Sequence, residues 1–249
     1  MTGTTDPGPA RIGELLDGVR RSATRLDVTL DALTDARARR PSTLPGWSRA
    51  HVLTHLARSA DAYVWLLTLA RTGTAPGPRA DAAALDRALR EGAERDAAAL
   101  VADLRGSLHR LLDTAEAMPA DRWPTLVRAL AGWRHPAWYT LHRAQRELET
   151  HHVDLDLGYR VTDWPAGYVA RALDETVAAL AARDFPLARV RATDLDRDWD
   201  TGSDGPAVTG PGPALLAWLC GRGPHTPLLS DGPLPTPPRW PLPPAPGWC

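Results

Sequence analysis

The chain has 249 residues, of which 43% are hydrophobic, enough for the core of one large domain or two small ones. Its 29 basic and 30 acidic residues give a formal net charge of -1, which excludes the broad positive surface of a nucleic-acid-binding protein. Every basic residue is an arginine, so chemistry that needs a Schiff-base lysine or a P-loop lysine is excluded as well.

Cysteine content and apolar runs indicate the expected compartment. Only Cys220 and Cys249 are present, far apart in the chain, which excludes a disulfide framework and a cysteine-rich zinc module. The N-terminal segment lacks the cationic start and apolar core of a signal peptide. No apolar run approaches the roughly 18 residues of a membrane span. We therefore expect a cytoplasmic protein that does not bind membranes.

The first two thirds of the chain have the apolar periodicity of long helices. Ser48 is a suitable N-cap for the second helix and Gly73 a suitable end, while Gly92 favours a break in the third. Four long helices predict a four-helix bundle. The predicted helices cover residues 10–33, 48–73, 85–115 and 136–157.

The pattern changes after Tyr159, where helical and strand-like segments alternate over short distances. Residues 163–185 and 213–223 predict helices, and residues 187–210 and 226–232 predict short strands. From Pro233 on, proline dominates and predicts an extended or disordered tail. The expected fold is mainly α with an α+β C-terminal part. Its predicted parts are a bundle over residues 1–159, a small α+β domain over residues 160–240 and a proline-rich tail over residues 241–249.

The fourth predicted helix contains the sequence QRELETHHVDLDLGY, which concentrates ionisable residues. Glu147, His151 and Asp154 are spaced by four and three residues and so lie on one helix face, which coincides with the inner apolar stripe. Glu149 and His152 are rotated away from that face, and we expect them to face solvent or the second domain.

A lone inward-facing histidine is more often a core residue than a metal ligand. A buried carboxylate with imidazoles, however, is costly unless the groups pair or hold a metal, and bundles build such sites from facing helices. Two histidines and one carboxylate would leave coordination positions open, as catalytic sites require.

The second helix offers two histidines, His51 and His55, as the further ligand. His51 falls in the first turn after Ser48, where it can serve in capping. His55 lies one turn deeper and can reach a facing helix. We favour His55 as the ligand and His51 as an orienting or substrate-side neighbour, and the reverse assignment stays open.

Three segments carry a resemblance to a known family: LPGWSRAHVLTHLARSADAYVWLL, RELETHHVDLDLGY, and GPGPALLAWLCGRG followed by PPRW. They resemble the mycothiol-dependent maleylpyruvate isomerases of actinobacteria over Ile12 to Trp240. The resemblance implies an N-terminal DinB-like four-helix bundle in which zinc is held by His55, Glu147 and His151. The ligand types alone would also permit iron or nickel.

The resemblance also implies roles for Asp154 and Arg222 at the active site. Asp154 would orient a ligand histidine, although a helix-end acid paired with an arginine is an equal alternative. Arg222 would grip a substrate carboxylate with its guanidinium. Without the resemblance, Arg222 would be interpreted as a surface residue after a helix end.

A metal with an open position lowers the pKa of a bound thiol, so that the reactive thiolate exists near neutral pH. Neither cysteine suits this role, because Cys249 is in the tail and Cys220 is expected to pack in an apolar helix end. The thiol would therefore be a small molecule, and the resemblance implies mycothiol. Its thiolate would add to an unsaturated acid such as maleylpyruvate, permit bond rotation and leave.

Two other functions remain open from the sequence. The first is a mycothiol S-transferase, in which the thiol stays attached to an electrophile. The second is a metal-binding module without catalysis, since a fold does not determine a function. For any of them the expected oligomeric state is a monomer or a homodimer.

Overall fold

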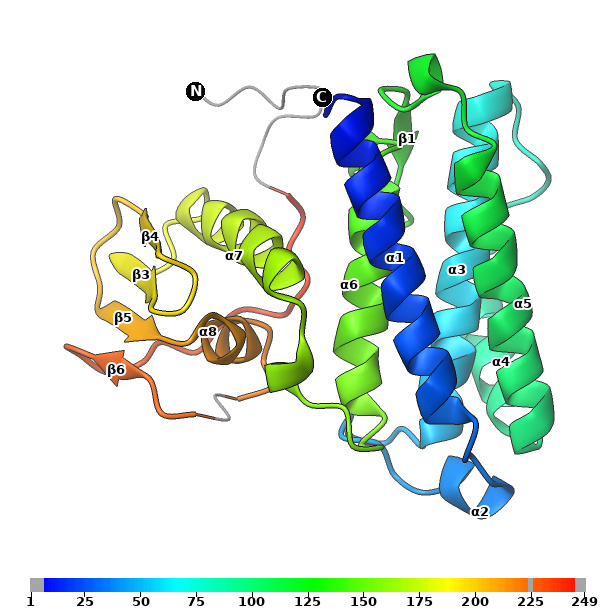
Figure 1. The fold of residues 1–249 in the computed structure, drawn as a ribbon, viewed down its shortest axis with the longest axis horizontal. Helices are drawn as coiled ribbons and strands as arrows, with labels where there is room; N and C mark the ends of the chain where they lie inside the picture. Colours follow the sequence, from blue (N-terminus) through cyan, green and yellow to red (C-terminus); the bar gives the residue numbers. More distant parts are fainter. Residues whose placement is uncertain (1–6, 224–225, 245–249) are drawn as a thin grey trace. The chain divides into compact units, whose positions relative to one another are not determined.

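The computed structural model describes residues 7–223 and 226–244. These residues form two compact units, one up to Tyr159 and one from Arg160 on (Figure 1). Helices dominate the first unit, and the second combines helices with a small sheet, which confirms the predicted fold class. None of the helices in the described part of the chain combines the length and apolar character that a membrane span requires.

The first unit is a bundle in which α1 packs against α6, α6 against α3, and α3 against α5 (Figure 1). Its core is made of the apolar stripes of these helices, as the periodicity predicts. The short α4 packs on α3. The helices of this unit are α1 (Pro9–Leu30), α2 (Asp35–Ala38), α3 (Arg49–Thr72), α4 (Ala82–Ala93), α5 (Ala97–Glu116) and α6 (Tyr139–Asp154), with a 3-10 turn η1 (Ala120–Arg122).

The caps of α3 and the break in the third predicted helix agree with the sequence, whereas α6 differs in length from the prediction. Ser48 is the N-cap of α3, and Gly73 ends the helix in the left-handed conformation. The break expected near Gly92 is confirmed, because Asp96 begins α5 as a separate helix by accepting a hydrogen bond from Ala99 N at 2.7 Å. Helix α6 is shorter than predicted at both ends and stops before Asp156, whose φ of 51° turns the chain.

In the second unit, α8 contacts α7 and the central strands of a four-stranded sheet of order β4-β3-β5-β6. Strands β3 and β5 are parallel, and the outer pairs are antiparallel. The helices and strands expected here are confirmed, and residues 233–244 carry no regular secondary structure. The elements are η2 (Val161–Asp163), α7 (Ala166–Ala181), β3 (Arg189–Ala192), β4 (Arg197–Asp200), β5 (Ala207–Gly210), α8 (Gly212–Leu219) and β6 (Leu229–Ser230).

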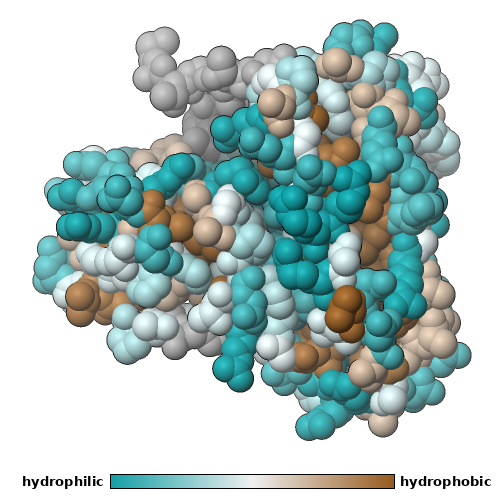
Figure 2. Space-filling model, in the orientation of Figure 1, coloured by the Kyte–Doolittle hydropathy of each residue, from teal (hydrophilic) through white to brown (hydrophobic). Residues whose placement is uncertain are grey.

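The visible face of the bundle is mostly hydrophilic over α1 (Figure 2). Apolar side chains emerge between α1 and α5, where a shallow groove is lined by leucines that include Leu26, Leu104 and Leu108. Charged side chains such as Asp27 and Arg105 bridge the rim of this groove.

A hairpin that the sequence analysis did not anticipate precedes α6. Strand β1 (Leu126–Arg128) pairs antiparallel with β2 (Arg134–Pro136) and places His135 opposite Val127. The His135 side chain is fully buried. Its Nδ1 lies 2.8 Å from Pro136 O, and because a carbonyl only accepts, Nδ1 carries the proton. The Nε2 atom then accepts from Arg143 Nη1 at 3.1 Å, so a neutral His135 orients an arginine of α6.

This arrangement predicts an acid-sensitive contribution to stability. Burial and the charges of neighbouring arginines lower the pKa of His135 from 6.5 to about 4, although the bond to Pro136 O opposes them. The folded state therefore resists protonation, and its advantage is complete above pH 6.5 and is lost as the pH falls towards 4. Between pH 7 and 4.5 we expect the free energy of unfolding to fall by about 2 kcal/mol through this residue.

Urea unfolding of the parent and of His135→Asn across this pH range measures the effect. The parent should lose more stability than the variant by roughly this amount, since both share every other titrating group. Parallel pH profiles for the two proteins would contradict the neutral His135.

Candidate active site

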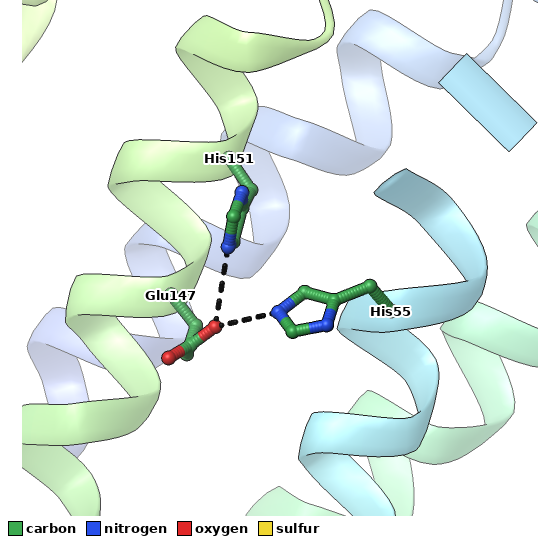
Figure 3. A group of neighbouring side chains, drawn as sticks. All are labelled: His55, Glu147 and His151. Atoms are coloured by element: carbon green, nitrogen blue, oxygen red, sulfur yellow. Dashed lines mark hydrogen bonds and ion pairs between the residues drawn. The ribbon is translucent and has the colours of Figure 1, made fainter. Parts of the chain in front are cut away.

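His55 of α3 and Glu147 and His151 of α6 point toward one another across the bundle (Figure 3). The Nε2 atom of His55 lies 3.0 Å from Glu147 Oε2, and Nε2 of His151 lies 3.4 Å from the same oxygen. The three ligand atoms all lie within 4.8 Å of one another, and the two imidazole centroids are 4.7 Å apart.

These separations fit a divalent ion. Nitrogen and oxygen ligands at about 2 Å from a tetrahedral metal stand about 3.3 Å from each other, close to the two distances to Glu147. His151 also donates from Nδ1 to Asp154. In the neutral form of His151, Nε2 therefore carries a lone pair, which points at the Glu147 carboxylate oxygen. Two acceptors at this separation are compatible when a cation or a proton lies between them.

Local features of α3 and α6 explain why these two helices bring the three residues together. Glu147 and His151 are four residues apart and share one face of α6. His55 lies a turn inside α3, whose first turn is closed by a capping box between Ser48 and His51. His51 Nδ1 lies 2.7 Å from Ser48 Oγ and 3.3 Å from Ser48 N. His51 therefore caps the helix, and the structure brings His55 to the cluster.

Asp154 supports the cluster from the end of α6. Its Oδ2 lies 2.8 Å from Nδ1 of His151, and its side chain is fully buried. Thr43 donates to Asp154 twice, from Oγ1 to Oδ1 at 3.1 Å and from its backbone N to the backbone O at 3.0 Å. These contacts hold the His151 ring with Nε2 facing His55 and Glu147.

The electrostatics of the cluster reflect this pairing. Burial by itself would raise the pKa of the Glu147 carboxyl, but hydrogen bonds and charges from His151 and His55 hold that pKa well below its usual value. Burial would likewise lower the pKa of His151, but Asp154 and Glu147 outweigh it and raise the pKa to about 9. Without a metal, the raised pKa leaves His151 protonated near neutral pH, where it pairs with the Glu147 carboxylate. A bound metal cation would take the place of the proton on Nε2.

A cavity of about 480 Å³ opens beside the cluster, with His55 and Glu147 in its wall. The indole of Trp47 lies 5.5 Å from the His55 ring, measured between centroids. The remaining wall combines apolar side chains with three arginines. It comprises Arg58, Ser59, Ala62, Tyr63, Leu66, Arg79, Leu85, Asp86, Leu89, Leu130 and Arg143.

The prediction that Glu149 and His152 face solvent is wrong, and the alternative that they face the second domain stays a prediction. Their exposed fractions are 1% and 2%. Glu149 accepts hydrogen bonds from Ser22, Arg25 and Tyr159, and His152 stacks on the Tyr159 ring. The reason is that α1 covers this face of α6. Helix α6 therefore buries two of its faces. The apolar stripe in its sequence predicts only one of them, because the second buried face carries polar residues.

Arg222 lies in the second unit, just after α8. It donates from Nη1 to Cys220 O at 2.9 Å, and its guanidinium carbon lies 5.7 Å from the Trp240 ring centroid. Its role at the active site stays a prediction. Cys220 is buried, with Sγ 3.5 Å from Ala217 O, whereas Cys249 and its predicted location in a tail lie outside the described residues.

Known proteins share this architecture. Two crystal structures match over 96% of this chain and 100% of their own, each with a TM-score of 0.84. One is a mycothiol-dependent maleylpyruvate isomerase with 25% identity, and the other is a histidine-to-alanine mutant of such an isomerase with 24% identity. No curated protein sequence matches significantly.

Family models match most of the chain. Residues 163–239 match the model described as the MDMPI C-terminal domain. Residues 19–156 match the model described as the mycothiol maleylpyruvate isomerase N-terminal domain, and this match covers more than half of the chain and includes the cluster. The chain belongs to the mycothiol-dependent maleylpyruvate isomerase family.

Proposed function

We propose that this protein is a metal- and mycothiol-dependent cis-trans isomerase of maleylpyruvate or a related unsaturated acid, acting in the cytoplasm. The observation that carries the proposal is the cluster of His55, Glu147 and His151 in the wall of a cavity large enough for small-molecule reactants. Membership of the family and the likeness to a solved isomerase support it.

His55, Glu147 and His151 would hold the metal, which we propose to be zinc. When bound there with an open position, the metal supplies a lowered thiol pKa, so that a thiolate is available near neutral pH. Asp154 keeps a proton on Nδ1 of His151 and thereby presents Nε2 as the ligand atom. The apolar wall, with Trp47 and Leu66, limits the water around the reacting atoms.

The thiol would be mycothiol, because Cys220, the cysteine in the described part of the chain, is buried. In this proposal the thiolate would add to the double bond of the substrate, forming a carbon–sulfur bond while the π electrons move onto the conjugated carbonyl group as an enolate. Rotation about the resulting carbon–carbon single bond would follow, and return of the electrons from the enolate would expel the thiolate and restore the double bond in the trans form. The thiol is regenerated, so atoms and electrons balance. A contribution of Arg222 to carboxylate binding remains part of this proposal.

Removal of a single ligand should abolish metal binding without unfolding the bundle. We expect His55→Ala, Glu147→Ala and His151→Ala each to lose bound metal, since a metal held by two remaining ligands dissociates readily, while the apolar stripes stay intact. Elemental analysis and circular dichroism measure the two properties. His109→Ala is the control, because the side chain of His109 is 80% exposed and its ion-pair partner among the described residues is nearby Asp113. Full metal content in all three ligand variants would rule the site out.

Asp154 should affect metal affinity without being a ligand. We expect Asp154→Asn to bind the metal about 10- to 100-fold more weakly, because the charge that stabilises the His151 ring is lost. Competition with a chromophoric chelator measures the change. Asp121→Asn is the control, since the Asp121 side chain is 78% exposed and lies in η1, outside both helices of the cluster. Equal affinity of Asp154→Asn and the parent would leave Asp154 with a purely structural role.

The reaction is tested with the metal-loaded protein, maleylpyruvate and mycothiol. We expect conversion to the trans isomer by proton NMR, dependent on catalytic amounts of mycothiol and with no net thiol consumption. Consumption of one thiol molecule per substrate molecule would instead identify the protein as an S-transferase. Absence of reaction, together with an unchanged absorption spectrum of the cobalt-substituted protein on adding mycothiol, would indicate a metal-binding module without catalysis.

A further inference from the structure

Three arginines line the cavity beside the metal-ligand cluster, and they differ in their counter-charges. Arg58 pairs with Asp61 at 3.0 Å and with Asp103 at 2.8 Å. Within residues 7–223 and 226–244, by contrast, no carboxylate forms an ion pair with Arg79 or Arg143. The cavity wall therefore contains two arginines that form no ion pair with a described carboxylate.

The guanidinium of Arg143 is held in place by neutral groups. Its carbon lies 5.0 Å from the ring centroids of both Tyr63 and Trp133. His135 accepts from its Nη1 at 3.1 Å. Aromatic faces and a neutral imidazole orient a guanidinium without neutralising it. The side chain is thus pre-organised, and little conformational entropy remains to be lost when it binds an anion.

One donor of Arg143 is also unused. Its Nε is buried and has no hydrogen-bond partner among the described residues. An unpaired buried donor of this kind destabilises the folded protein. A ligand in the cavity can meet only the accessible nitrogen atoms of the guanidinium, and a guanidinium offers parallel N–H donors that match the two oxygens of a carboxylate.

Arg79 adds a second positive charge to the same cavity. Its guanidinium lies 5.2 Å from the Trp65 ring centroid, and Nη1 donates to Arg128 O at 2.7 Å. Burial and the charge of Arg143 both lower the pKa of Arg79, which indicates that the two cations repel each other. An anion bound in the cavity would relieve this repulsion.

The position of Arg143 relates this anion to the metal-ligand cluster. Arg143 precedes Glu147 by four residues on α6, and the two lie on one face roughly 6 Å apart at their Cβ atoms. Glu147 and Arg143 both contribute to the cavity wall. A ligand that reaches the cluster can therefore extend a carboxylate towards Arg143.

We propose that Arg143, oriented by His135 and assisted by Arg79, is a specificity-determining residue that binds a carboxylate of the substrate. The site would then select an unsaturated dicarboxylate over a monocarboxylate of similar size. The link to catalysis rests on the proposed isomerase function, whereas anion binding by Arg143 is independent of any reaction.

The test is calorimetric titration of the metal-loaded protein with maleate and with isocrotonate, a monocarboxylate that has the same cis double bond. The parent should prefer maleate. Arg143→Gln should bind maleate about tenfold or more weakly and lose the preference, because charge-assisted hydrogen bonds are removed. Arg143→Lys should recover part of the affinity. Arg110→Gln, which alters an exposed arginine on α5, should behave like the parent, and all variants should keep their metal.

Equal maleate affinity of Arg143→Gln and the parent would overturn the proposal, and so would a parent that fails to discriminate maleate from isocrotonate. If Arg143→Gln does not fold, Arg79→Gln in the α3–α4 connection is measured in its place. We expect this variant to lose less maleate affinity than Arg143→Gln would. An unchanged maleate affinity of Arg79→Gln would overturn the role of the two arginines. Dicarboxylate binding through Arg143 without isomerisation would refute the proposed function alone. Isomerisation with unchanged KM for the acid in Arg143→Gln would refute this inference alone.

Discussion

The structure depends on how α6 buries ionisable side chains inside an apolar bundle. A buried charge destabilises a fold unless it is paired and hydrogen-bonded. Helix α6 meets this constraint differently on its two buried faces. On the α1 side, Glu149 is neutralised by Arg25 and accepts from Ser22 and Tyr159. On the α3 side, Glu147 faces two imidazoles. On the α1 side, other protein groups pair with the buried charge. On the α3 side, a cation would complete the pairing of Glu147 and the two histidines.

The relative position of α3 and α6 is fixed at the end where the cluster lies. Arg49, the first residue of α3, is buried and donates from Nε to Leu155 O at 2.6 Å and from Nη2 to Asp156 O at 2.8 Å. These carbonyls belong to the end of α6, whose last carbonyl groups have no partner within the helix. Thr43 binds Asp154 beside them. Together these contacts set the register between His55 and its two partners on α6, as a pre-organised site requires.

The cavity beside the metal-ligand cluster also contains charged side chains in its wall. Glu147 contributes a negative charge to the cavity wall, Arg143 contributes a positive charge one helical turn away on α6, and Arg79 adds a second positive charge from the α3–α4 connection. Neutral groups, namely His135 and aromatic rings, hold Arg143 in place. This separation of charge over a short distance suits a substrate that presents an anionic end to the arginines and its reacting carbons to the cluster. The hairpin that carries His135 thereby contributes to the functional surface from outside the bundle helices.

The sequence by itself determined the helical bundle, the caps of α3 and the spacing of Glu147 and His151, because periodicity and capping are local properties of the chain. It also predicted His55 over His51, because one extra turn of helix changes what a side chain can reach. Only the tertiary structure showed that Glu149 and His152 are buried, since a neighbouring helix decides which polar face meets solvent. It alone brought His135 and Arg79 to Arg143, because contacts between a hairpin, a loop and a helix depend on packing and leave no periodic pattern in the sequence.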